Sequence, residues 1–456
     1  MSTSASPAPP AVSSNPAPLA ASSAPAARPR VVVLGGGFAG VGAARKLKDV
    51  AVDVVLIDAH DYHTFQPLLY QVASGLLETS AVGHPLRDLL RKQPNATVRQ
   101  STVAGVDLAR REVRFEDMAP LTYDYLVLAL GARVHFFGTE GAAEHAFPLY
   151  TLVDAVRLKE HLLQRWAAAD RDPALVADGA LNVVVVGGGP TGVESAGALI
   201  ELYRADMAKD YPHVGQAAAR VTLVEAGPDL FSTFKPDLRA YARRALEARG
   251  VEVLLGERVA AVTPKQVTLA SGKVLPAHTV VWGAGLQGHP LAGSLGLELQ
   301  RGRRLVVGPE LSVPGHPELF AVGDIAWIAD AATGGALPQL GSVAMQSGEH
   351  AGETIARRVA GLPPAPFAYV DKGSMAAIGR GTAVVQLRRG RTLKGKAAML
   401  TWGLVHLALL PSGEDRVKSL VSWIWAGFTR ERTARITLAA ASGRERESGA
   451  PPAAGR

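Results

Sequence analysis

Two glycine-rich turns, each followed later by an acidic residue, carry the clearest chemistry in this sequence. The first turn has the pattern Gly-x-Gly-x-x-Gly and comprises Gly35, Gly37 and Gly40, with Phe38 and Ala39 between the last two glycines. Glycines at this spacing permit a tight turn and let a pyrophosphate approach the N-terminus of the following helix, where free N–H groups attract an anion. Asp58 ends the next apolar run, where a carboxylate accepts hydrogen bonds from ribose hydroxyls. The pattern therefore predicts a dinucleotide site.

The same pattern returns in the middle of the chain. Its residues are Gly187, Gly189, Pro190, Thr191 and Gly192. Pro190 suits the first helical position because its missing N–H costs nothing there. Glu225 ends the following apolar run 33 residues after Gly192, whereas Asp58 follows Gly40 by 18, so we expect an inserted loop around residues 209–216. Two such folds imply two dinucleotides, and a plain structural repeat does not explain why each half has its own acid.

The composition excludes several classes of protein. The chain has 456 residues, 48% of them hydrophobic, a net charge of +7 and no cysteine. Without cysteine it has no disulfide, no thiol catalysis and no cysteine-ligated metal, and we expect no metal site. No apolar run reaches the roughly 18 residues that span a bilayer. Residues 1–29 are rich in Ala, Ser and Pro and show no signal-peptide pattern, so we predict a disordered tail and a cytoplasmic location.

These elements predict an α/β fold with two Rossmann-like dinucleotide-binding domains and a C-terminal amphipathic region. Further buried strands end at Gly131, at Gly285 and at the Gly323-Asp324 pair, and helices are expected at 86–91, 237–249 and 344–358. The predicted domain boundaries are 30–150 and 286–365 for the first dinucleotide domain in two parts, 151–285 for the second, 366–440 for the C-terminal region, and 441–456 for a disordered tail.

Four longer motifs carry a resemblance to a known family. They are Phe320-Ala-Val-Gly-Asp324, Tyr62-His-Thr-Phe-Gln-Pro-Leu-Leu-Tyr-Gln-Val-Ala73, the block from Pro366 to Gly379, and Trp402-Gly-Leu-Val-His-Leu407. In residues 30 to about 430 the chain resembles the type II NADH:quinone dehydrogenases among the two-dinucleotide flavoproteins. The resemblance implies FAD at the first glycine turn, NADH at the second, and electron transfer to a membrane quinone without proton pumping. Glu225 favours NADH because a carboxylate repels a 2′-phosphate.

The resemblance also implies roles for residues outside the glycine turns. Cofactor contacts are expected from Gln66, Gly131, Gly285, Gly323, Asp324 and Ala344, and catalytic or quinone-side roles from Glu194, Gln346 and Lys372. Glu194 is implied in proton transfer or gating, although a carboxylate near a helix N-terminus is also favourable by itself. Lys372 is alternatively a solvated strand residue. The chain departs from the family pattern at Ser342, where glutamine is usual, and at Leu130, where threonine is common.

The C-terminal region has the composition of an interfacial membrane anchor. Residues 380–447 contain thirteen Lys or Arg and five Asp or Glu, interleaved with Trp402, Leu404, Leu407, Leu409, Leu410, Val421, Trp423, Ile424, Trp425 and Phe428. Basic residues beside tryptophan-bearing apolar faces suit an anionic membrane surface, here through residues about 395–430 on the cytoplasmic face of a bacterial inner membrane. A dimer interface is the alternative, and a homodimer stays open. We expect no nucleic-acid partner. Two other functions stay open: reduction of a soluble redox protein, and NADH sensing without turnover.

Overall fold

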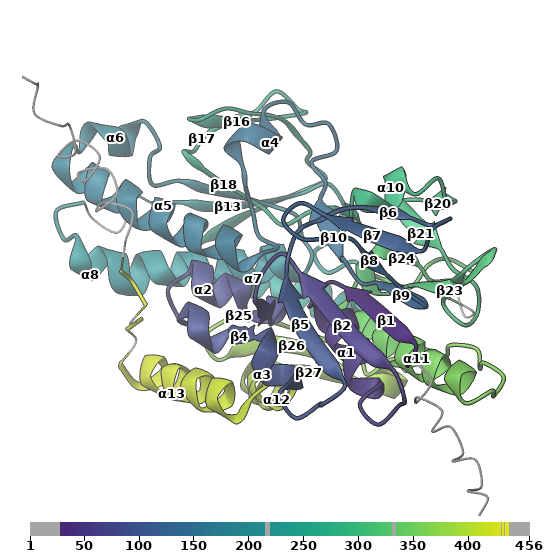
Figure 1. Ribbon diagram of the computed structural model, residues 1–456. Helices are drawn as coiled ribbons and strands as arrows, with labels where there is room; N and C mark the ends of the chain where they lie inside the picture. The colour runs from purple at the N-terminus through teal and green to yellow at the C-terminus, as the bar shows by residue number, and fades with distance from the viewer. Residues whose placement is uncertain (1–27, 215–218, 331–333, 430, 433, 437–456) are drawn as a thin grey trace, which may run out of the picture.

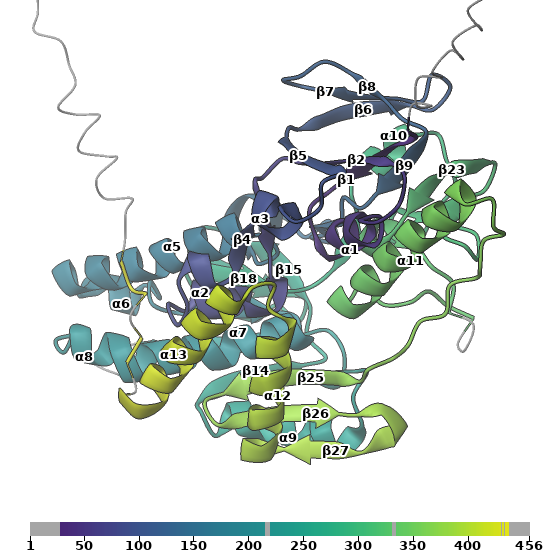
Figure 2. The ribbon, with the colours of Figure 1, turned by 60° about the horizontal axis from the view of Figure 1, so that its bottom comes forward.

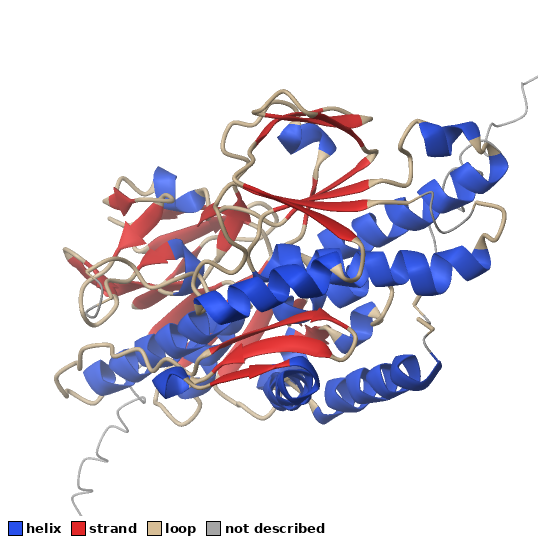
Figure 3. Ribbon diagram, turned by 180° about the vertical axis from the view of Figure 1, so that it is seen from behind, coloured by secondary structure: helices blue, strands red, loops and turns tan. Residues whose placement is uncertain are grey.

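The structure is a computed structural model that describes residues 28–214, 219–330, 334–429, 431–432 and 434–436. The predicted tails, 1–29 and 441–456, lie outside the described residues except for residues 28 and 29. The described chain forms two sheet-based units and a smaller C-terminal unit of strands and helices, which Figure 3 shows from behind. This α/β architecture confirms the predicted fold class.

The first glycine turn lies at the end of the central strand of a six-stranded sheet, whose order is β22-β23-β9-β1-β2-β5. All pairs are parallel except β22 with β23. The strands are β1 (Arg30–Leu34), β2 (Asp53–Asp58), β5 (Ala96–Gln100), β9 (Tyr125–Leu128), β22 (Ser312–Val313) and β23 (His316–Ala321). After Arg30 every residue of β1 is buried, as expected for the centre of a parallel sheet. This sheet joins an early and a late part of the chain.

Helices α1 (Phe38–Lys46) and α11 (Gly341–Val359) pack closely side by side, as Figure 1 shows. Two glycines of α11 make this approach possible. A Cβ on Gly348 would lie 1.9 Å from the carbonyl oxygen of Ala39, and one on Gly352 would lie 2.6 Å from that of Ala43. The close packing fixes the N-terminus of α11 beside the first glycine turn. The predicted helix began at residue 344, three residues late.

Short elements surround this sheet. They are β3 (Tyr62–Thr64), β4 (Gly83–Pro85), α3 (Leu86–Leu90), β6 (Val103–Asp107), β7 (Glu112–Phe115), β8 (Leu121–Thr122), α10 (Leu291–Ser294), β20 (Leu299–Gln300), β21 (Arg304–Val306) and β24 (Ala326–Trp327). The helix α2 (Leu69–Ala73) instead packs against α5 (Leu152–Arg171) and α7 (Pro190–Glu201). The two-stranded ribbon of β10 (Ala132–Val134) and β19 (Leu286–Gly288) connects this unit with the second one.

The second glycine turn follows β12 (Val183–Val186), the central strand of a five-stranded parallel sheet with the order β11-β18-β12-β13-β14. The other strands are β11 (Phe147–Pro148), β13 (Val221–Glu225), β14 (Val251–Leu255) and β18 (Thr279–Trp282). Its helices are α4 (Ala142–His145), α5 (Leu152–Arg171), α6 (Ala174–Ala177), α7 (Pro190–Glu201) and α9 (Pro236–Glu247), and the sheet β15 (Val259–Val262), β16 (Gln266–Leu269), β17 (Val274–Pro276) lies beside it. The order places β18 and β13 on opposite sides of β12.

The inserted segment after α7 differs from the prediction. The chain continues from α7 as a π-helical turn, Leu202–Met207, and then as α8 (Ala208–Asp210). The extra length before Glu225 is therefore partly helical, while residues 215 and 216 of the predicted loop lie outside the described residues. Tyr203 and Met207 of the π-helical turn are buried, and this burial stabilises the extension.

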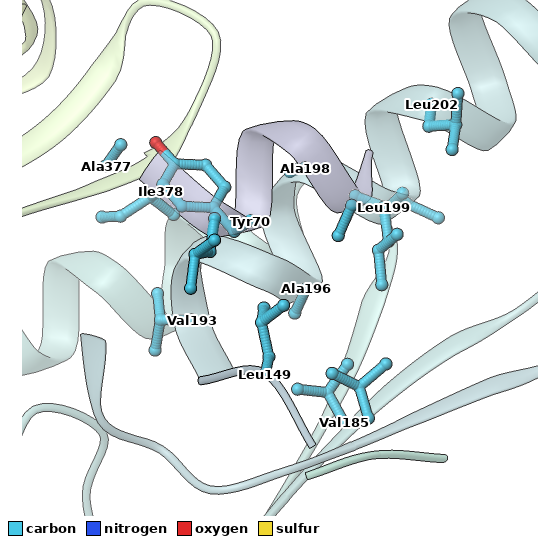
Figure 4. Close-up of a cluster of buried hydrophobic side chains, with 14 of the residues drawn as sticks. Tyr70, Leu149, Val185, Val193, Ala196, Ala198, Leu199, Leu202, Ala377 and Ile378 are labelled. Carbon is cyan, nitrogen blue, oxygen red and sulfur yellow. The ribbon is translucent and has the colours of Figure 1, made fainter. Parts of the chain in front are cut away.

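The C-terminal unit consists of β25 (Ser374–Gly379), β26 (Thr382–Gln386), β27 (Thr392–Lys394), α12 (Gly395–Leu409) and α13 (Gly413–Thr429). Figure 2 shows α12 against this small sheet and α13 beside α12. The unit is joined to α7, because a Cβ on Gly197 would lie 2.1 Å from the carbonyl oxygen of Ile378. Figure 4 shows the cluster at this contact, with Val193 and Ala196 of α7 near Ile378 and Tyr70.

Candidate active site

The first glycine turn has the geometry of a phosphate cradle. Gly35 has a φ of +107°, and a Cβ on Gly40 would lie 1.8 Å from the carbonyl oxygen of Gly35. For Gly37, by contrast, no atom of the described residues beyond its chain neighbours lies within 4 Å of the position of a Cβ. Gly35 and Gly40 are therefore required by the backbone conformation and packing of the turn itself. Gly37 instead leaves open space at the N-terminus of α1, as binding of a pyrophosphate requires.

Asp58 holds this turn in place. Its carboxylate accepts hydrogen bonds from the N–H groups of Gly36 (2.6 Å) and His60 (2.8 Å), while its side chain is 21% exposed. A carboxylate can accept about four hydrogen bonds, so Asp58 retains capacity toward a ribose.

Ten predicted cofactor residues line one cleft above the carboxyl ends of β1 and β2. They are Gly35, Gly37, Phe38, Ala39, Asp58, Gln66, Gly131, Gly323, Asp324 and Ala344. Gly40 is not among the lining residues because its role is to let α1 pack on the turn. An open glycine at a helix N-terminus, with one carboxylate at each side of the cleft, fits a dinucleotide such as FAD.

Tyr150 is a member of this site that the sequence patterns did not predict. Its hydroxyl donates to Asp324 Oδ2 (3.1 Å) and accepts from the N–H of Ala132 (3.1 Å). Burial raises the pKa of Asp324, and the Tyr150 hydroxyl and Arg304 oppose that shift. Gln66 Nε2 donates to the carbonyl oxygen of Tyr150 at 3.4 Å. Tyr150 belongs to no glycine motif. Because it is 174 residues from Asp324 in the chain, local sequence patterns could not predict their hydrogen bond.

The second glycine turn repeats the first. Gly187 has a φ of +111°, a Cβ on Gly192 would lie 1.8 Å from the carbonyl oxygen of Gly187, and Gly189 faces open space. The helix begins with Pro190, as predicted, and the carbonyl oxygen of Thr191 accepts a hydrogen bond from Ser195 (2.6 Å). The turn is therefore a second dinucleotide cradle.

Glu225 lies beside this turn. Its carboxylate accepts hydrogen bonds from the N–H groups of Gly188 and Gly227, the latter at 2.6 Å. The neighbouring β18 ends at Trp282, and a Cβ on the following Gly283 would lie 3.2 Å from the backbone nitrogen of Gly192. Gly285 comes two residues later, with a φ of +71°. Gly187, Gly192, Gly283 and Glu225 therefore meet at this turn, and the roles of the predicted residues toward NADH stay predictions.

Glu194 lies on α7 and is buried. Its Oε1 accepts a hydrogen bond of 3.0 Å from the N–H of Ala377 in β25. Burial raises its pKa to about 8, which the Ala377 hydrogen bond and Trp402 oppose. The buried indole N–H of Trp402 lies near this carboxyl group without making a hydrogen bond of good geometry. Near pH 7 the group therefore holds a proton, so it is not a solvated helix-end carboxylate, and its role in proton transfer stays a prediction.

Aromatic residues surround Glu194 on the side of the C-terminal helices. His406 stacks on Trp402 with ring centroids 4.1 Å apart, and burial lowers its pKa to about 4, so it is neutral. Trp423 Nε1 donates to Gln71 Oε1 (2.7 Å), and Gln71 Nε2 donates to the hydroxyl of Tyr70 (3.0 Å). These contacts were not predicted from the sequence as parts of a site.

The two other residues predicted to be catalytic lie apart from Glu194 in the hydrogen-bond network. The amide of Gln346 makes a reciprocal pair with the backbone of Val370 (3.0 and 3.1 Å), so it holds the segment before β25. Lys372 is exposed. Ser342 Oγ lies 2.9 Å from the Tyr369 hydroxyl. The roles of Gln346 and Lys372 toward a quinone stay predictions.

The C-terminal helices correct part of the predicted anchor. Trp402 and Leu410 are 0% and 1% exposed, so they belong to the core and cannot contact a membrane. An apolar face nevertheless remains exposed on α12 and α13. It comprises Leu400, Leu404, Leu409, Val417, Leu420, Val421, Ile424, Trp425 and Phe428. In the described part of the chain, no helix is both long and apolar enough to cross a bilayer.

The fold and the paired cradles define a two-dinucleotide oxidoreductase. Residues 29–348 match the family model of the pyridine nucleotide-disulphide oxidoreductases. The chain belongs to this family and, within it, to the type II NADH:quinone oxidoreductases, which confirms the resemblance seen in the sequence.

Relatives and solved structures support this membership. The chain is 36% identical to the type II NADH:quinone oxidoreductase Ndh of Mycobacterium tuberculosis, over 90% of each chain. It is 30% identical to an internal alternative NAD(P)H-ubiquinone oxidoreductase of Arabidopsis thaliana mitochondria, over 87% of this chain and 84% of the relative. The structure of NDH2 from Plasmodium falciparum in complex with NADH is similar in fold, with a TM-score of 0.82, 20% identity, and coverage of 89% and 99%.

Proposed function

We propose that the protein oxidises NADH and reduces a membrane quinone, with FAD in the first cradle and NADH in the second. One observation carries this proposal. Glu194, on the helix that starts at the second cradle, holds a proton and is bonded to the sheet that supports the exposed apolar helices. A proton-holding group thus lies between the dinucleotide sites and the face that suits a membrane. The names of the relatives support the same reaction.

The first cradle holds FAD through its own groups. The N-terminus of α1 binds the pyrophosphate at Gly37, Asp58 accepts from a ribose, and Asp324 is presented by its bond to Tyr150. FAD supplies, when bound, a ring that accepts a hydride and passes on two electrons. The protein contributes by orienting the two cofactors and by excluding water.

The second cradle selects NADH. Glu225 already accepts from the N–H groups of Gly188 and Gly227, so its carboxylate is fixed where the adenosine ribose binds. A 2′-phosphate would meet this negative charge, which disfavours NADPH.

The apolar face of α12 and α13 binds the membrane surface. Trp425 and Phe428 are 52% and 88% exposed, and Lys396 of α12 and Arg416 of α13 are exposed too. Apolar side chains beside cations suit the boundary between anionic headgroups and acyl chains. Three statements stay predictions: that this membrane surface is the cytoplasmic face of a bacterial inner membrane, that the protein can form a homodimer, and where the domain boundaries lie.

The test is an assay of NADH oxidation by the purified FAD-loaded protein, with a water-soluble quinone analogue and with a quinone in anionic vesicles. We expect turnover with both. The double variant Trp425→Ser/Phe428→Ser should keep the first activity and lose vesicle binding and the second activity. Leu362→Ser, at an exposed apolar residue on another surface, is the matched control. Absence of quinone-dependent turnover with FAD bound contradicts the proposal.

A second candidate acceptor is a soluble redox protein. It is favoured by Ser342, which stands where the family pattern has glutamine and whose hydroxyl is already engaged with Tyr369. This function predicts rapid NADH-dependent reduction of a one-electron protein acceptor such as cytochrome c, unchanged by the double variant, with no quinone reduction in vesicles.

A further inference from the structure

Phe137 occupies a backbone conformation that phenylalanine rarely adopts. It lies in a turn of residues 136–139, which is closed by the hydrogen bond from the N–H of Thr139 to the carbonyl oxygen of Phe136 (2.9 Å). The φ angles of the two central residues are +54° for Phe137 and +74° for Gly138. A turn with positive φ at both central positions favours Gly, Asn or Asp there, and a bulky residue is strained.

Burial does not repay this strain. Phe137 is 64% exposed, whereas its neighbour Phe136 packs against Trp282 with ring centroids 5.3 Å apart. An exposed ring removes little apolar surface from water, so the turn gains little stability from it. Strained residues that packing does not explain are candidates for a functional role.

The ring lies at the second cradle. The turn follows β10, and the N–H of His135 donates to the carbonyl oxygen of Gly285 (3.1 Å). A Cβ on Gly285 would lie 2.5 Å from two ring carbons of Phe137, so only glycine at this position admits the ring. The His135 ring meets the Phe137 ring edge to face at 4.7 Å and supports it.

The strand order indicates which half of NADH meets the ring. Glu225, at the end of β13, marks the adenosine ribose, and the turn after β12 marks the pyrophosphate. Because β18 is on the other side of β12, a dinucleotide that continues in the same direction reaches the end of β18 with its nicotinamide half. Gly285 and Phe137 lie at that end.

We propose that Phe137 is a positioning residue for NADH, whose exposed ring packs against the nicotinamide half of the substrate. The proposal rests on the function proposed above for the second cradle. The strained turn presents the ring at a fixed place, and Gly285 provides the space for it. Stacking on an aromatic ring orients a planar base without requiring hydrogen bonds.

The test variant is Phe137→Asn, because asparagine suits this turn and lacks the ring. The matched control is Arg111→Gly, which relieves another positive φ (+51°) in the turn between β6 and β7. Calorimetry measures the Kd of NAD⁺ and of ADP-ribose, which lacks nicotinamide, on the FAD-loaded protein. We expect Phe137→Asn to weaken NAD⁺ binding about tenfold. ADP-ribose binding, FAD content and Tm should not fall, and the KM for NADH should rise.

Three results overturn the inference: an unchanged Kd for NAD⁺, an equal weakening of NAD⁺ and ADP-ribose, or an equal effect of Arg111→Gly. Phe137→Tyr keeps a ring and should bind NAD⁺ like the wild type. If wild-type protein binds neither ligand, the second cradle is not an NADH site, and the proposed function fails together with the inference. Quinone-dependent turnover in the wild type with an unchanged Kd in Phe137→Asn refutes the inference alone.

Discussion

Glu194 accepts a hydrogen bond from the N–H of Ala377, 183 residues later in the chain, at 3.0 Å. The bond joins the helix of the second cradle to the sheet that carries the exposed C-terminal helices. Since the carboxyl group is buried and its pKa is raised to about 8, its charge state is coupled to the stability of the protein.

The stability of the protein should depend on Glu194 in a definite pH range. The folded protein retains this proton up to a pH of about 8, whereas the unfolded chain loses it near the ordinary value of 4.5. The free energy of unfolding therefore falls as pH rises between these values, by about 1.4 kcal/mol per pH unit. Glu194→Gln should flatten this part of the curve in urea titrations. Glu252→Gln, at a half-exposed side chain, should leave it unchanged.

The pH dependence of kcat should also reflect the ionisation of Glu194. If the protonated carboxyl group takes part in the reaction, kcat of the wild type falls above a pH of about 8. Glu194→Gln should lower kcat about 100-fold, in the range usual for loss of an acid–base group, and should remove this pH dependence. Steady-state assays with saturating NADH at several pH values measure both effects. A wild-type profile that persists in the variant would assign the ionisation to another group.

Substitutions of two glycines in the first cradle should have different effects on protein stability and on FAD binding. Gly40→Ala places a Cβ 1.8 Å from a carbonyl oxygen, so we expect a lower Tm and loss of bound flavin. The methyl group of Gly37→Ala meets no atom within 4 Å among the described residues beyond its chain neighbours, so the apoprotein should keep its Tm. Its Kd for FAD should nevertheless rise at least about tenfold, a loss of about 1.4 kcal/mol. Flavin absorbance and thermal melts of the apoprotein distinguish the two variants, and equal Tm losses would contradict this division.

Arg432 should fasten the segment after α13 to the body. It is buried, donates to the carbonyl oxygens of Ala198 (2.7 Å) and Ser74 (3.0 Å), and lies 3.5 Å from a carboxylate oxygen of Glu201. Arg432→Met leaves buried acceptors and carboxylates without their cation, which should cost about 3–5 kcal/mol. Denaturant unfolding measures this loss. The surface variant Arg243→Met should cost about 1 kcal/mol or less, since its partner is exposed.

Glu225 should determine the choice between NADH and NADPH. Glu225→Ala removes the acceptor of two backbone N–H groups and the charge that opposes a 2′-phosphate. We expect kcat/KM for NADH to fall and that for NADPH to rise, so that their ratio changes by about 100-fold. Glu225→Gln retains an acceptor but loses the charge, so it should affect NADPH more than NADH. If the ratio of kcat/KM for NADH to that for NADPH is unchanged in both variants, Glu225 does not determine the choice of cofactor.

The local patterns of the sequence predicted the two cradles well. Glycine spacing, a preceding apolar strand and a terminal acid are all short-range features, so the sequence located Gly35, Asp58, Gly187 and Glu225. It did not predict that the two carboxylates accept hydrogen bonds from the N–H groups of the turns. Contacts between distant parts of the chain were not found. Tyr150 meets Asp324 only after the sheet is assembled, and no periodicity near residue 150 indicates that pair.

The C-terminal helices show why composition alone misassigns a face. Trp402 has the residue type and the basic neighbours of an interfacial anchor, yet it fills the space between β26 and Glu194. The helix α12 is apolar on most of its surface, so the sequence could not distinguish the side that packs from the side that stays exposed. The sequence also could not show that the amide of Gln346 donates a hydrogen bond to the backbone of Val370, 24 residues later in the chain.

The packing of α1 against α11 has a consequence for how the protein is made. Gly348 must approach Ala39 before the first cradle is closed, and Gly323 is held by Ser347 in the same late helix. During synthesis the cradle therefore stays incomplete until α11 has left the ribosome, while the second sheet, β11 to β18, is already available to fold. FAD can stabilise the nascent chain only near the end of translation, which makes the second unit the natural starting point of folding.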